Sequence, residues 1–395
     1  MLTHLSVKNY KSLKSLDLQL KPFMALVGPN NAGKTNLVDA FQFLRDFQAL
    51  GSGAINERGG FEGLAWDGRS ANKIEIALSG SLSTSKMSTK VSPKAVSFTY
   101  VLELEGMKTY HTVTHETFSV ILDGKEMTLL RGGAREDDVR GQFRGSIVYD
   151  LEGHETGRIS ADSSAPSLPY FQNLQEYPLL ADFLTAIRRW DFHSFEPHMM
   201  MRQNPVKKAL RLEDQGDNIA TVLHTLQTEY PLSFEDIQEK LRLAIPEIRR
   251  LVTPLTETGQ TFIAVEETGL SVRVPAWAMS DGTLCFLAVL TALLSPDGPT
   301  LICVEEPENY IHPHLLAFLV ELLESASTHS QVIITTHSPY LVEAVKDPRH
   351  LLIVEKSNGI TRTSWASKKR GVKDALRTLG LGEFWYSGAL GGVPR

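Results

Sequence analysis

Residues 28–35 read Gly28-Pro29-Asn30-Asn31-Ala32-Gly33-Lys34-Thr35. This segment matches the pattern G-x-x-x-x-G-K-[ST] and lies between an expected strand (24–27) and an expected helix (36–50). The glycines let backbone N–H groups turn towards a phosphate, Lys34 adds a positive charge, and the hydroxyl of Thr35 can bind Mg²⁺. Gly28–Asn36 therefore predicts a site for ATP and Mg²⁺, in preference to a chance glycine-rich turn.

Two carboxylates follow a second expected strand. The apolar run Leu301–Val304 leads directly into Glu305, Glu306 and Pro307. Acidic residues at the C-terminal end of a parallel strand lie where open α/β sheets bind their ligands. We expect Glu305 to hold Mg²⁺ and Glu306 to polarise the attacking water. A solvated acidic turn is the alternative interpretation.

A serine-glycine turn and a late histidine complete the candidate site. Ser280 and Gly282 precede the helical run 284–294. They are explained either by helix capping alone or by a second phosphate-binding helix end that reaches a nucleotide on another subunit. His337 ends the expected strand 332–336, one strand after the carboxylates, which favours contact with a γ-phosphate over a purely structural role.

The remaining pattern predicts an α/β fold. The strand-like stretches 2–7 and 23–27 are separated by a polar segment, and alternation over 73–150 predicts an antiparallel β layer. Helical spacing dominates 179–248, and strands alternate with helices from 262 onwards, which predicts a parallel sheet. We therefore expect a parallel core sheet plus an antiparallel layer, with a helical insertion. The expected segments are 1–160, 161–260 and 261–395.

Composition limits the class of protein. The chain has 395 residues, 42% of them hydrophobic, and a formal charge of −6, which fits a globular protein and gives no general sign of nucleic-acid binding. No apolar run is long enough to cross a bilayer, and the amino terminus does not have the pattern of a signal peptide. With Cys285 and Cys303 as its cysteines, the chain is expected in the cytoplasm without disulfides. The locally basic runs 188–211 and 362–377 are explained best as solvated faces, and DNA contact there stays an alternative.

These motifs, in this order, resemble the ABC-type ATPases of the RecF, SMC and OLD group, and most of all the compact AAA15-like members. Further likeness lies in Leu5–Ser12, Arg58–Glu62, Leu212–Asn218 and Ser387–Gly392, so the resemblance covers nearly the whole chain. It implies the following assignments: Walker A for Gly28–Asn36, Walker B for Leu301–Glu306 with Glu306 as the catalytic carboxylate, the signature motif for Ser280–Thr283, the D-loop for Glu308–His312, and the switch histidine for His337.

The resemblance also has departures and consequences. Glu305 stands where the group usually has Asp, and Gln172 and Gln175 are the candidates for the Q-loop glutamine. The 58 residues from 338 to 395 are too few for the nuclease domain that many OLD-type proteins carry, so we expect none. The group's chemistry implies a nucleotide-sandwich homodimer, or a higher homo-oligomer, that acts with a protein effector as motor or sensor in DNA maintenance or phage defence. The alternative is an ATP-dependent scaffold that holds an effector, such as a nuclease or toxin, with little turnover.

Overall fold

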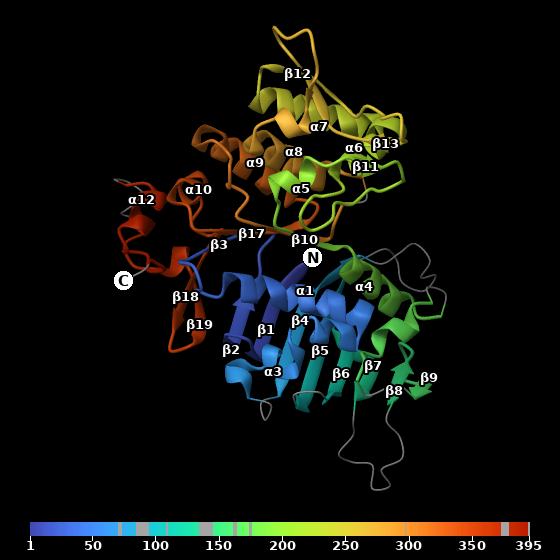
Figure 1. The fold of residues 1–395 in the computed structure, drawn as a ribbon. Coiled ribbons are helices and arrows are strands. Elements are labelled where there is room, and N and C mark those ends of the chain that lie inside the picture. The colour runs from blue at the N-terminus through green and yellow to red at the C-terminus, as the bar shows by residue number, and fades with distance from the viewer. Residues whose placement is uncertain are drawn as a thin grey trace. The chain divides into compact units, whose positions relative to one another are not determined.

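The computed structural model describes residues 1–69, 73–83, 95–107, 110–133, 145–160, 164–173, 176–296, 298–372 and 379–393. The chain forms two compact units, shown in Figure 1. Unit 1 consists of residues 1–21, 30–190 and 354–363, and unit 2 of residues 22–29, 191–353 and 364–395. The units are therefore interleaved along the chain.

Unit 1 is built on an eight-stranded antiparallel sheet in the order β2-β1-β4-β5-β6-β7-β8-β9. Buried and more exposed residues alternate along β4 and β5, as expected for strands with one face on a core. The predicted antiparallel layer is therefore confirmed. Its strands are β1 (Leu2–Tyr10), β2 (Leu13–Gln19), β4 (Ile74–Ser83), β5 (Ala95–Met107), β6 (Tyr110–Leu122), β7 (Lys125–Gly133), β8 (Gly145–Tyr149) and β9 (Glu155–Ser160).

The polar segment near the amino terminus is more ordered than expected. It contains β2, which pairs with β1 so that Leu16 lies opposite Val7 and Leu18 opposite Leu5. These leucines alternate with polar residues, so the segment buries one face and exposes the other. A Ser/Thr/Lys-rich segment at 80–93 has the composition of a loop, but residues 80–83 belong to β4, and 84–93 lie outside the described residues.

Helices cover one face of this sheet (Figure 1). In α4, Phe183 packs on Phe98 and Phe118 of the sheet, with ring centroids 4.8 and 4.7 Å apart. Each such buried aromatic side chain stabilises the fold by about 1.5–3 kcal/mol. The expected helix 36–50 is confirmed and begins two residues earlier, at Lys34. The helices of unit 1 are α1 (Lys34–Leu50), α2 (Ser52–Asn56), α3 (Gly60–Leu64) and α4 (Pro178–Arg188).

The second large sheet has six strands in the order β10-β16-β17-β3-β18-β19. β16, β17, β3 and β18 pair in parallel in that order, so the expected parallel sheet is confirmed. β3 and β17 are buried along their whole length, as is typical of strands covered on both faces. β18 continues into unit 1, where it meets β19. The strands are β3 (Phe23–Val27), β10 (Trp190–His193), β16 (Leu301–Glu305), β17 (Gln331–Thr336), β18 (Leu351–Ser357) and β19 (Ile360–Trp365).

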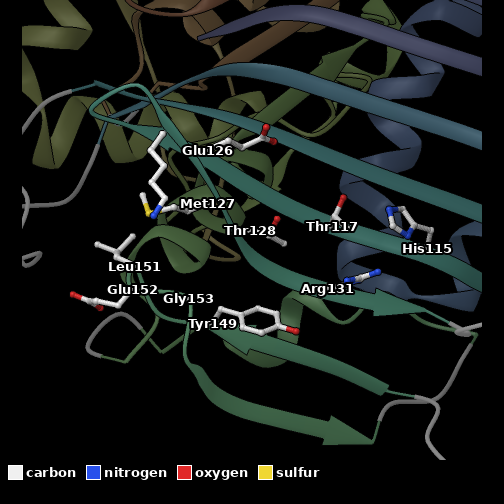
Figure 2. Close-up of a pocket in the computed structure, with 11 residues that line it drawn as sticks. His115, Thr117, Glu126, Met127, Thr128, Arg131, Tyr149, Leu151, Glu152 and Gly153 are labelled. Atoms are coloured by element: carbon white, nitrogen blue, oxygen red, sulfur yellow. The ribbon is translucent and has the colours of Figure 1, made fainter. Parts of the chain in front are cut away.

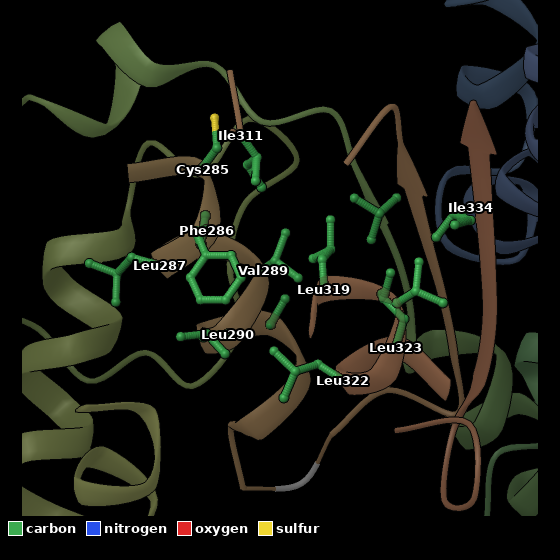
Figure 3. Packing of buried hydrophobic residues seen from close by; sticks show 14 of the residues in the cluster. Cys285, Phe286, Leu287, Val289, Leu290, Ile311, Leu319, Leu322, Leu323 and Ile334 are labelled. Atoms are coloured by element: carbon green, nitrogen blue, oxygen red, sulfur yellow. The ribbon is translucent and has the colours of Figure 1, made fainter. Parts of the chain in front are cut away.

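Helix α8 lies in the core of unit 2 (Figure 3). Its residues from Leu284 to Ala292 are all buried, as expected for a helix that is apolar on every side. Its neighbours α7 and α9 are amphipathic and cover it. The helices of unit 2 are α5 (Pro197–Met200), α6 (Ile219–Glu229), α7 (Pro231–Ala244), α8 (Asp281–Leu294), α9 (Leu316–Ala326), α10 (Pro339–Ala344) and α12 (Leu381–Tyr386).

Two small sheets accompany the helices of unit 2. One joins β11 and β13, and the other has the order β12-β14-β15. Among the helices that the structure describes, none combines the length and apolar character needed to cross a membrane. The bounds of the small strands are β11 (Asn204–Pro205), β12 (Ile248–Val252), β13 (Gln260–Thr261), β14 (Ala264–Glu267) and β15 (Val274–Pro275).

Candidate functional site

Three strands of unit 2 end at one edge of the parallel sheet. Glu305 of β16 lies opposite Thr335 of β17, and Thr336 lies opposite Val27 of β3. The residues that come next, Glu306, His337 and Gly28, therefore lie at the same edge. This is the edge at which open α/β sheets bind their ligands.

Glu306 is held in place by its backbone and by both carboxylate oxygens. Its φ of 45° is left-handed, a conformation that costs a non-glycine residue roughly 1–3 kcal/mol and is concentrated at functional sites. Its Oε1 lies 2.8 Å from Nδ1 of His337, and its Oε2 accepts a hydrogen bond of 3.1 Å from Nδ2 of Asn309. The side chains of Glu306 and His337 are 31% and 46% exposed, so the pair is accessible to solvent.

A second contact joins the same two strand ends. The hydroxyl of Thr336 donates to Oε1 of Glu308, and the N–H of Ser338 donates to that hydroxyl at 3.0 Å. Burial raises the pKa of Glu308, and its Oε2 has no hydrogen-bond partner in the part of the chain that the structure describes. The loop after β16 is thus fixed to the end of β17 by Glu306 and by Glu308.

The predicted signature turn forms the N-terminus of α8. The hydroxyl of Ser280 accepts a hydrogen bond of 3.2 Å from the N–H of Thr283, so Ser280 caps the helix. A Cβ atom at Gly282 would come within 2.4 Å of the carbonyl oxygen of Tyr310, so glycine is needed for the close approach of the segment around Tyr310. Ser280 itself is exposed and remains available to a ligand.

A cavity of about 250 Å³ lies beside the carboxylates in unit 2. One wall is a segment that the sequence interpretation missed, Ser194–Glu196, which follows β10. Gln172, a Q-loop candidate, instead accepts a hydrogen bond from Arg188 in unit 1, and Gln175 lies outside the described residues. The strand before Ser194, Trp-Asp-Phe-His, alternates aromatic and polar residues, and this alternation predicts a strand but not its place beside the carboxylates. The lining residues are Ser194, Phe195, Glu196, Cys285, Val289, Glu305, Glu306, Pro307, Asn309 and Tyr310.

The phosphate loop enters unit 1 at Asn30. Asn31 and Gly33 have φ values of 64° and 102°, which turn the backbone into a compact loop before α1 begins. A Cβ atom at Gly33 would lie 2.0 Å from Oγ1 of Thr361, so only glycine fits there. Lys34 is 7% exposed, whereas Thr35, in the first turn of the helix, is exposed.

Helix α1 is fixed by a cluster of ion pairs. Arg58 donates from Nε to Asp39 at 2.9 Å and from Nη2 to Asp46 at 2.8 Å, and both aspartates lie on α1. Lys11 adds a third ion pair, to Asp39. Nearby cations and the hydroxyl of Tyr10 hold the pKa of Asp39 below its ordinary value against the opposing effect of burial. Arg58, which lies between α2 and α3, thus immobilises the helix that follows the phosphate loop.

Other candidate sites are less informative. A cavity of about 470 Å³ lies over β6, β7 and the turn after β8 (Figure 2). Its lining includes both signs of charge, Lys125 and Arg131 with Glu126 and Glu152, so it favours no class of ligand. In the described ranges, no group of three or more His, Cys, Asp or Glu side chains is arranged to hold a metal ion.

The basic run 188–211 is partly neutralised by acidic neighbours. Arg211 pairs with Asp191, and Lys208 pairs with Glu229. Arg188 instead bonds to the amide of Gln172. These contacts favour the interpretation of a solvated face over a DNA-binding patch.

Sequence comparisons agree with this geometry. Residues 1–97 match the family described as "AAA ATPase domain", and residues 159–343 match the family described as "AAA domain, putative AbiEii toxin, Type IV TA system". The Old nuclease of Escherichia phage P2 is 22% identical over 387 residues, 93% of this chain and 61% of that protein. The DNA replication and repair protein RecF of Roseiflexus castenholzii is 41% identical over 61 residues, 15% of this chain and 16% of that protein. The chain thus spans about three-fifths of the Old nuclease and a smaller share of RecF.

A solved structure supports the same fold. The SMC head in the crystal structure with the C-winged helix domain of ScpA superposes with a TM-score of 0.55, at 13% identity, over 92% of this chain and 97% of that one. At this identity the likeness concerns the fold, which is an ABC-type ATPase head. Together, the matched families, the similarity to the Old nuclease and the fold support an ABC-type ATPase of the OLD/RecF/SMC group.

Proposed function

We propose that this chain binds and hydrolyses ATP with Mg²⁺ and that ATP closes two copies of it into a sandwich. The observation that supports hydrolysis most directly is the 2.8 Å contact between Glu306 and His337. Both residues stand at the sheet edge from which β3 leads directly into the phosphate loop. A purely structural acidic turn would not need a left-handed carboxylate residue paired with a histidine.

The residues of the phosphate loop fit a triphosphate. The left-handed backbone at Asn31 and Gly33 makes a compact turn of the kind in which backbone N–H groups can face an anion. Lys34 supplies positive charge at the first turn of a 17-residue helix, whose dipole also favours an anion. The hydroxyl of Thr35 and the carboxylate of Glu305 are the groups that would hold Mg²⁺, which supplies charge to neutralise the phosphates. The longer side chain of Glu305, in place of the usual Asp, suits a contact through water.

Glu306 is the group that would orient and deprotonate the attacking water. Its hydrogen bonds to His337 and Asn309 fix the direction of the carboxylate before any nucleotide binds. A positioned general base typically contributes about 10²- to 10⁴-fold to a rate. His337, on the neighbouring strand, then acts both as the orienting partner and as the predicted contact to the γ-phosphate.

The exposed N-terminus of α8 supports the sandwich. Ser280 and Asp281 are exposed, whereas Leu284–Ala292 of the same helix are buried. The N-terminus of a helix is a favourable place for a phosphate. Two-fold symmetry would bring this end of each subunit onto the nucleotide of its partner.

We further propose that the ATPase serves as motor or sensor in DNA maintenance or phage defence, with a protein effector as partner. The similarity to an Old nuclease and to a DNA replication and repair protein supports this role. The test is the rate of phosphate release with and without DNA. Turnover above background is expected. ATP-driven self-association without turnover would instead support the scaffold that holds an effector.

A further inference from the structure

The phosphate loop is connected to two distant parts of the chain by buried hydroxyl groups. Ser12, at the turn between β1 and β2, and Thr361, in β19, lie 2.7 Å apart through their side-chain oxygens. They are 6% and 1% exposed. Nothing in the sequence motifs points to either residue as part of the nucleotide site, yet both lie against Gly33.

The directions of the hydrogen bonds follow from the number of available protons. The hydroxyl of Thr361 donates its one proton to the carbonyl oxygen of Ala32 at 2.9 Å. Because that proton is already used, the hydroxyl of Ser12 must donate to Thr361, and Ser12 in turn accepts a hydrogen bond of 2.7 Å from Nδ2 of Asn36. The result is a chain Asn36 → Ser12 → Thr361 → Ala32 that begins and ends on the phosphate loop.

Two further contacts tie the same elements together. The N–H of Thr361 donates to the carbonyl oxygen of Ser12 at 2.9 Å. Nζ of Lys356, in β18, donates to Oδ1 of Asn31 at 3.2 Å. The turn Asn358-Gly359, with φ values of 51° and 76°, joins β18 to β19 and so places Lys356 and Thr361 on one hairpin. This hairpin meets the loop at two successive residues, Asn31 and Ala32.

We propose that Thr361 and Ser12 are positioning residues that keep the phosphate loop in its nucleotide-binding shape. The inference rests on the proposed ATP binding and extends the site to the β18–β19 hairpin. Hydrogen bonds in a buried chain reinforce one another, so the loop keeps its left-handed residues without help from a ligand. Loss of the Thr361 hydroxyl leaves the carbonyl of Ala32 without its donor and the hydroxyl of Ser12 without its acceptor.

The test compares Thr361→Val, which keeps the shape but loses the hydroxyl, with Thr361→Ser, which keeps the hydroxyl. The affinity for Mg²⁺-ATP is measured by calorimetry. Thr361→Val is expected to bind roughly 10-fold more weakly, the effect of one or two lost hydrogen bonds. Thr361→Ser is expected within about 3-fold of wild type, and Ser12→Ala is expected to weaken binding in the same direction as Thr361→Val.

A matched control is the hydroxyl pair of Ser79 and Thr99, 3.2 Å apart across β4 and β5 in the same unit. Thr99→Val should leave ATP affinity unchanged. If Thr361→Val lowers the melting temperature of the nucleotide-free protein more than Thr99→Val does, the inference is supported when Thr361→Ser restores ATP affinity and Ser12→Ala weakens it. The inference about Thr361 would be overturned, with the proposed ATP binding left intact, by either of two results. One is wild-type ATP affinity in Thr361→Val, and the other is the same loss of affinity in Thr361→Ser as in Thr361→Val. Wild-type protein that fails to bind Mg²⁺-ATP would overturn the proposed function as well.

Discussion

The phosphate loop and the acidic sheet edge differ in how they are held. The loop in unit 1 is supported from behind by buried side chains of two distant segments, and Lys34 is almost completely buried. The edge in unit 2 presents a partly exposed Glu306 and His337, which are held chiefly by each other and by Asn309. The difference indicates that the loop is built before nucleotide arrives, whereas the contacts of the carboxylate can be exchanged when substrate binds.

This comparison predicts that the two regions can be disabled separately. Changes at the loop should weaken binding, and changes at the sheet edge should stop turnover without weakening binding. The largest separation is expected at Glu306, since a change there affects the chemical step.

Glu306→Gln keeps the size of the side chain but removes the base. Phosphate release should fall by about 10²- to 10⁴-fold, while calorimetry shows ATP affinity close to that of wild type. Glu305→Gln is the matched control at the preceding residue. If Glu306→Gln kept full turnover and Glu305→Gln were inactive, the roles proposed for the two acids would be reversed.

Lys34→Ala tests the prediction that changes at the phosphate loop weaken ATP binding. The variant loses a charge-assisted contact worth about 1.5–3 kcal/mol, so ATP affinity should fall by roughly 10- to 150-fold. Calorimetry with Mg²⁺-ATP gives the value directly. Lys356→Ala is the control on the hairpin: it removes a lysine that contacts the loop through Asn31, and it should cost much less. Unchanged affinity in Lys34→Ala would contradict the assignment of residues 28–36.

The proposed sandwich is tested in the Glu306→Gln background, where ATP persists. Light scattering should show self-association with ATP and less with ADP, because the γ-phosphate joins the subunits. Adding Ser280→Arg should block association by its bulk and positive charge. Cross-linking of Ser280→Cys to Asn30→Cys is a second readout, since Asn30 is exposed, whereas Gly33 has no room for a side chain. The sandwich would be contradicted if the mass measured by light scattering were the same with and without nucleotide and the cross-link did not form.

The motifs and the two large sheets could be predicted from the sequence because each depends on local pattern. The glycines of residues 28–35 and the acids after 301–304 follow short apolar strands, and period-two alternation identifies the antiparallel layer. The start of α8 could be predicted because Ser280 is followed by a continuous apolar helix, and its role as a signature motif stays a prediction.

The supporting residues could not be predicted for a physical reason. Ser12 and Thr361 are 349 positions apart, and a serine or threonine has the same local signal whether it lies on the surface or behind a phosphate loop. Glu196 is similar, because only the pairing of β10 next to β16 brings its segment to the cavity. Contacts of this kind depend on topology, which local periodicity does not encode.

The smallest predicted effect compares the buried carboxyl groups of the two units. Glu116 of unit 1 is fully buried and accepts hydrogen bonds from the N–H groups of Ser167 (2.6 Å) and Leu168 (3.3 Å) and from the hydroxyl of Tyr100 (2.9 Å). Glu308 of unit 2 has one oxygen without a partner among the described residues. Burial raises the pKa of both groups, and for Glu116 it outweighs the opposing effect of the hydrogen bonds.

A raised pKa in the folded state means that the folded protein holds the proton more tightly than the unfolded chain does. The stabilisation by Glu116 is therefore fully present below the ordinary value of 4.5 and is lost as the pH rises through the raised pKa. Glu116→Gln removes this ionisation, so the free energy of unfolding in urea should fall less steeply above pH 4.5, by at most about 1.4 kcal/mol per pH unit. Glu308→Gln should act in the same direction, and Glu126→Gln, at an exposed residue, is the control.

Identical pH profiles for Glu116→Gln and wild type would show that Glu116 is not the group that titrates. A smaller change for Glu308→Gln than for Glu116→Gln would indicate that its unpartnered oxygen is reached by water, as expected if the sheet edge opens more readily than the layer behind α1.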